Sequence, residues 1–112
     1  MVTNDKIYLG TELKLNINIK PIDGLSMSQY NWTIEAYCNP NNKVTITSED
    51  ALRGVNAYMV DDDNYVIKVS TEKIGVGVIK CKITAELPDL DFSDNKRIEV
   101  EIINTGIEIV KT

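Results

Sequence analysis

The chain has 112 residues, a net charge of −5 and no histidine. This length fits one domain, expected to span residues 1–112, whose core needs neither a disulfide nor a metal. Its hydrophobic content of 43% and charged content of 26% are typical of a globular domain rather than a disordered chain. The acidic balance and the scattered basic residues argue against binding to nucleic acid or to anionic membranes.

No apolar run approaches the ~20 residues that a membrane-spanning helix needs. The first residues also lack the apolar segment of a secretory signal. We therefore expect synthesis in the cytoplasm and no insertion into a membrane.

Alternation of apolar and polar residues is the main pattern along the chain, and it predicts strands with one buried and one wet face. It first appears in residues 11–20 and 30–38, whose inward apolar residues are Leu13, Leu15, Ile17, Ile19, Trp32, Ile34, Ala36 and Cys38. Turn residues and shorter apolar runs predict further strands and two capped helical turns. The strands are expected at residues 6–9, 43–47, 57–60 and 65–69, and the turns at 48–54 and 70–75.

The longest clean alternation runs through residues 77–87, which we predict to be the central strand. Its inward set is Ile79, Cys81, Ile83, Ala85 and Leu87.

A further strand is predicted at residues 96–103, with Ile98, Val100 and Ile102 inward. Thr105 and Gly106 are expected to end it, and residues 107–110 to form a last short strand or a tail.

Seven or eight short strands near ten-residue spacing, without a long helix, indicate an all-β fold. The pattern predicts an immunoglobulin-like β-sandwich of two antiparallel sheets. Trp32 then lies on the third strand of that fold, where such sandwiches often bury a tryptophan.

Three segments carry a resemblance to a known group of domains. They are the run Gly10-Thr-Glu-Leu-Lys-Leu-Asn-Ile-Asn-Ile, the turn Asp23-Gly24, and the run Tyr30-Asn-Trp-Thr-Ile-Glu-Ala. Together with the glycine-containing turn before the central strand, they resemble the immunoglobulin-like domains of bacteriophage and prophage tail and baseplate proteins. The resemblance implies a structural or assembly module, possible incorporation into a virion or tail particle, and no catalysis.

The residue types also favour a protein without enzymatic activity. The absence of histidine removes the commonest general base and metal ligand. Gly75-Val-Gly77 lacks the Lys and Ser or Thr of a phosphate-binding loop. We expect no catalytic residue, no metal and no cofactor.

Residues 88–95 are the predicted partner-binding site, because they join two apolar residues to three acids. Its residues are Asp89, Leu90, Asp91, Phe92 and Asp94. The acids are interpreted as a solvated hairpin tip rather than a cation site. Phe92 is either a plug at one end of the core or an exposed anchor for a partner.

We expect a protein partner or self-association. The alternative is a bacterial surface module that binds protein or carbohydrate. Cys38 and Cys81 are predicted to lie on adjacent strands as free, buried thiols.

Overall fold

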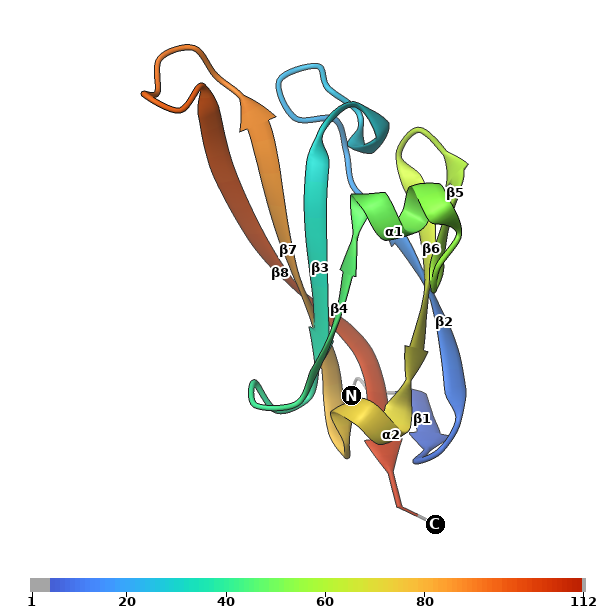
Figure 1. Ribbon diagram of the computed structural model, residues 1–112. Helices are drawn as coiled ribbons and strands as arrows, with labels where there is room; N and C mark the ends of the chain where they lie inside the picture. The colour runs from blue at the N-terminus through green and yellow to red at the C-terminus, as the bar shows by residue number, and fades with distance from the viewer. Residues whose placement is uncertain (1–4, 112) are drawn as a thin grey trace.

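A computed structural model describes residues 5–111 and shows an all-β fold (Figure 1). Within these residues, eight strands form two sheets, joined by two short α-helices and one 3-10 turn. The elements are β1 (Asp5–Tyr8), β2 (Glu12–Asn18), η1 (Met27–Gln29), β3 (Asn31–Tyr37), β4 (Lys43–Thr47), α1 (Ser48–Arg53), β5 (Ala57–Asp61), β6 (Asn64–Ser70), α2 (Thr71–Ile74), β7 (Gly77–Pro88) and β8 (Lys96–Val110). Neither helix is long or apolar enough to cross a membrane in this part of the chain.

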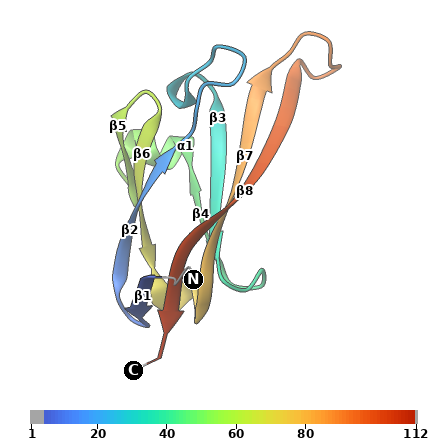
Figure 2. The same cartoon turned by 180° about the vertical axis from the view of Figure 1, so that it is seen from behind.

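The larger sheet has the strand order β1-β8-β7-β3-β4, and the smaller sheet has the order β2-β6-β5. The larger sheet is strongly curled, and the core lies between it and the smaller sheet (Figures 1 and 2). In both views the far end of the β7–β8 hairpin projects away from the smaller sheet.

The core is centred on β7, as the alternation predicts. Ile83 and Cys81 of this strand lie opposite Ile34 and Ala36 of β3, and all four are buried. The two sheets meet through the edge-to-face contact of Trp32 with Tyr65, whose ring centroids are 5.0 Å apart. Such aromatic pairs add to the stabilisation that burial provides.

The prediction of two purely antiparallel sheets is wrong for the first strand. β1 pairs with β8 in parallel, with Asp5 opposite Ile107 and Tyr8 opposite Val110. A tight turn follows, in which the Thr11 N–H donates to the Tyr8 carbonyl at 3.1 Å. This turn carries the chain into β2 of the other sheet, so β1 and β2 do not form a hairpin.

The prediction that Thr105 and Gly106 end a strand is also wrong, because β8 continues through them as a bulge. Here Ile79 of β7 faces residues 105–107, since Lys80 pairs with Asn104 and Val78 with Glu108. The Thr105 hydroxyl donates to the Ile79 carbonyl at 2.8 Å and keeps the two strands together. Gly106 has a φ of +72°, a conformation that glycine adopts without strain.

The predicted inward orientation of Ile98, Val100 and Ile102 is wrong as well. These residues lie opposite Glu86, Thr84 and Lys82, on the outer face of the larger sheet. Directly opposed residues of antiparallel strands share a face. Because the odd-numbered residues of β7 fill the core, the even-numbered residues of β8 must point outward.

The two predicted helical turns are present as α1 and α2. Thr47, rather than Ser48, caps α1, since its hydroxyl accepts from the Asp50 N–H at 3.2 Å. Gly54 ends this helix in a left-handed conformation with φ +71°.

The cysteines are free and lie on adjacent strands or at their ends, as predicted. Cys81 is completely buried, and burial raises the pKa of its thiol to about 11. The predicted burial of Cys38 is wrong, because this residue follows the last residue of β3 and is only half-buried. Its thiol donates to the Gly77 carbonyl at 3.2 Å. Burial raises the pKa of the Cys38 thiol as well.

The first prediction compares two isoleucines that the fold places on opposite faces. Ile83→Ala should lower the free energy of unfolding by about 2–5 kcal/mol, because Ile83 is buried. Ile102→Ala should lower it by less than about 1 kcal/mol, because that side chain is exposed. Urea unfolding of both variants measures the difference, and equal losses would show that the β7–β8 register is wrong.

The second prediction concerns thiol reactivity. In a Cys38→Ala variant, Cys81 should resist a thiol reagent until denaturant is added, because the reactive thiolate is scarce and inaccessible. In a Cys81→Ala variant, Cys38 should react measurably in the native state. Rapid labelling of native Cys38→Ala protein would contradict the buried position of Cys81.

Candidate functional site

The predicted partner-binding loop forms the tip of the β7–β8 hairpin, and its apolar side chains are exposed. Leu90 is 88% exposed and Phe92 is 48% exposed. Phe92 is therefore not a buried plug, and that interpretation is wrong. Of the two alternatives, the structure leaves Phe92 accessible to a partner.

Two acids of this loop accept hydrogen bonds from backbone N–H groups of the loop and of the start of β8. An Asp89 carboxylate oxygen accepts from the Asp91 N–H at 3.0 Å, and the Asp94 carboxylate accepts from the Lys96 N–H at 3.2 Å. Local bonds of this kind are typical of turns. Among residues 5–111, no three Cys, Asp or Glu side chains are gathered so that they could hold a metal ion.

Arg97 connects the hairpin to the loop between β2 and β3. Its guanidinium contacts the carboxylate of Asp23, lies 3.3 Å from that of Asp89, and lies 3.2 Å from that of Glu99. The hydrogen bond to Asp23 is the largest cause that raises the pKa of Arg97. One cation thus holds together three acids, of which Asp23 is distant in sequence.

The outer face of the hairpin carries a row of exposed apolar side chains, which we call the outer apolar row. Ile98, Val100 and Ile102 are 54%, 53% and 58% exposed. Single exposed apolar residues are ordinary, whereas large contiguous apolar patches rimmed by polar residues mark interaction surfaces, so this row is a candidate for one.

The inner face of the same strand is acidic and borders a pocket of about 290 Å³, which we call the inner pocket. Its walls combine apolar and polar surface, and Glu99 and Glu101 belong to its lining. The lining also includes Ile19, Ile22, Tyr30, Ile83, Ala85 and Val100, which lies between the two glutamates in β8. Burial raises the pKa of the Tyr30 phenol, and the negative charges of Asp63 and Glu101 add to this shift.

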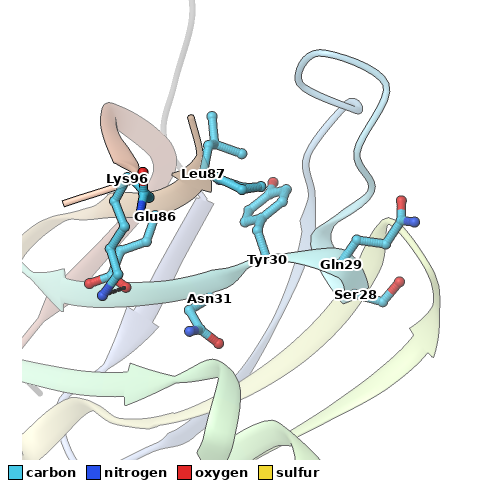
Figure 3. A pocket seen from close by; sticks show the side chains of 9 residues that line it. Ser28, Gln29, Tyr30, Asn31, Glu86, Leu87 and Lys96 are labelled. Atoms are coloured by element: carbon cyan, nitrogen blue, oxygen red, sulfur yellow. Dashed lines mark ion pairs between the residues drawn. The ribbon is translucent and has the colours of Figure 1, made fainter. Parts of the chain in front are cut away.

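A second hollow, of about 410 Å³, lies between the start of β3 and the end of the hairpin (Figure 3). Tyr30 and Leu87 line it, and Lys96 reaches Glu86, with 3.8 Å between the ammonium nitrogen and a carboxylate oxygen. Ser28 is part of this lining, but its hydroxyl is 3.2 Å from Asp62, a carboxylate in an exposed turn. These groups can bind polar ligands, and they form no nucleophile–base pair with histidine or lysine.

Comparisons of the chain with protein-family models, with curated proteins and with solved structures gave no match.

Sequence reasoning found the hairpin tip but missed Arg97, Glu99, Glu101 and the orientation of the outer apolar row. The sequence does contain a signal for the orientation of the outer apolar row. Ile102 and Ile103 are consecutive apolar residues, so the alternation in β8 changes phase between them. No local pattern links Arg97 to Asp23, because they are separated by 74 positions.

The third prediction tests the Arg97 contacts. Arg97→Gln should lower the melting temperature, because it leaves Asp23, Asp89 and Glu99 without their shared cation. Lys96→Gln, which loses only one exposed ion pair, should have little effect. High salt should reduce the difference between the two variants, since salt screens exposed charges. Identical melting temperatures at low salt would contradict a structural role for Arg97.

Proposed function

We propose that this chain is a non-catalytic protein-binding module whose β7–β8 hairpin contacts another protein. The observation that carries the proposal is the exposure of apolar side chains on one projecting element, at its tip and along its outer face. Leu90 and Phe92 provide the tip, and the outer apolar row provides the face. Acids lie beside the tip, and both acidic and basic residues of β7 border the outer apolar row. This is the composition of an apolar interface centre with a polar rim.

An immunoglobulin-like fold is part of this proposal. In that fold one sheet contains strands B, E and D in neighbouring positions, and the other contains G, F and C. The order β2-β6-β5 corresponds to the first set, and β8-β7-β3, extended by β4, corresponds to the second. This correspondence supports the proposed fold, on which many binding modules are built, but fold alone does not specify a function.

A protein partner is favoured over a carbohydrate by the distribution of exposed aromatic rings. Sugar-binding surfaces use aromatic rings as stacking platforms, whereas Tyr8, Tyr58 and Phe92 lie on β1, β5 and the hairpin tip, respectively. The exposed aliphatic side chains of the outer apolar row suit a protein surface better than a sugar.

Within this proposal, the biological setting is the assembly of a phage or prophage tail or baseplate, as the resemblance in sequence implies. Tail and capsid genes beside the gene for this chain would favour that setting. Genes for sugar use or export would favour the alternative of a surface binding module.

The fourth prediction tests the contact surface directly. A photo-crosslinking amino acid is introduced at Phe92, at Ile102 or, as a control, at Asn16, an exposed residue of β2 in the smaller sheet. In the cells that produce the protein, Phe92 and Ile102 should crosslink to one discrete protein species, identified by mass spectrometry, because both positions lie in the proposed interface.

The control position should give no such species, although the three variants should melt alike. Absence of a discrete adduct at the hairpin positions, or equal adducts at Asn16, would contradict the proposal.

A further inference from the structure

The hairpin has an open strand edge beside the outer apolar row. β1 pairs with β8 only from Ile107 to Val110, so residues 96–104 of β8 have β7 on one side and no strand on the other among the described residues. In both views this part of β8 lies at the outer margin of the molecule (Figures 1 and 2). An open edge presents backbone N–H and C=O groups that a further strand can use.

The backbone groups that face this edge can be assigned. The Asp89 N–H donates to the Asn95 carbonyl at 3.0 Å, which places Asn95 among the residues that bond across the hairpin. Along an antiparallel strand, such residues alternate with residues whose N–H and C=O point the other way. In β8, therefore, Arg97, Glu99 and Glu101 bond to β7, and the backbone groups of the outer apolar row point to the open edge.

The two faces of this edge differ in chemistry. The side chains of the outer apolar row cover the outer face, and Glu99 and Glu101 lie on the inner face beside the inner pocket. Arg97 shares the inner face, but Asp23, Asp89 and Glu99 already surround its guanidinium. The inner face is consequently acidic, and a complementary strand needs positive charge there.

We propose that the partner supplies an extended segment of alternating basic and apolar residues, which adds to the open edge of β8 as a further strand. Its basic side chains lie beside Glu99 and Glu101, and its apolar side chains lie beside the outer apolar row. Backbone bonds provide affinity, and the alternation of side chains provides selectivity, as in other cases of strand addition. This inference rests on the proposed function and names the partner's chemistry.

A second copy of the chain fits this edge less well. Twofold pairing of two β8 strands centred on Glu99 brings Glu99 opposite its own copy. Pairing centred on Val100 brings Glu99 opposite Glu101 of the other copy. Pairing centred on Ile98 brings it opposite Arg97, a cation that three carboxylates already occupy. Like charges directly opposite one another destabilise a strand pair.

The probe for the experiment is a synthetic eight-residue peptide of alternating valine and lysine, with an alternating valine and glutamate peptide as its control. Titration of the isotopically labelled protein, followed by NMR, should shift the backbone amides of Ile98, Val100 and Ile102 most. The lysine peptide should bind at least about tenfold more tightly than the glutamate peptide, a difference of about 1.4 kcal/mol.

Two substitutions at one position separate backbone pairing from side-chain contact. Val100→Pro removes an N–H that points to the open edge and leaves the β7–β8 hydrogen bonds in place, so it should weaken binding of the lysine peptide at least about tenfold. Val100→Thr keeps that N–H and a similar shape, and should bind within about threefold of the unmodified protein.

A third variant tests strand addition even if the Val100→Pro protein does not fold. Glu101→Lys should weaken binding of the lysine peptide and strengthen binding of the glutamate peptide. No binding of the lysine peptide at millimolar concentration, equal binding of both peptides, or undiminished binding by Val100→Pro would overturn strand addition. If the hairpin crosslinks still form in that case, protein binding by the hairpin stands and only strand addition fails.

Discussion

The register between β7 and β8 is the constraint on which the exposed surface of this protein depends. Ile83 lies opposite Glu101, and Ala85 lies opposite Glu99. In the half of the hairpin nearest its tip, the β8 side chains on the core-facing side are therefore acidic. The apolar side chains of Ile98, Val100 and Ile102 are thereby directed outward. A shift of one residue would exchange the two sets, since the side-chain period of a strand is two.

The register is explained by the rest of β8. Ile103, Ile107 and Ile109 have the opposite parity to the outer apolar row, and they pack against or belong to the core. The bulge at residues 105–107 adds an even number of residues, so it leaves this parity unchanged. Leu15 and Ile17 of β2 belong to the core against which Ile103 and Ile107 pack, so burial there favours one parity. The outer apolar row stays exposed because the whole of β8 keeps that parity.

Much of the fold follows from the sequence because β2, β3 and β7 each contain one continuous alternation with one apolar face. For those strands the inward residues were predicted correctly. β8 contains two apolar rows of opposite parity, and alternation alone does not say which of them meets the second sheet. The parallel β1–β8 pairing and the Arg97–Asp23 contact join residues far apart in sequence, so no local sequence pattern predicts them. The apolar tip of the hairpin could be predicted, because Leu90 and Phe92 follow a proline that ends the alternation.

Among the described residues, no strand lies beside residues 96–104 of β8 on the side away from β7, and the backbone groups of the outer apolar row point to this open edge. Amide hydrogen exchange measured residue by residue tests this arrangement most directly. The amides of Arg97, Glu99 and Glu101 should exchange slowly, because they bond to β7. Those of Ile98, Val100 and Ile102 should exchange almost as fast as in an unfolded chain. Equal protection of both sets, or protection of the even-numbered residues alone, would contradict the register and the open edge together.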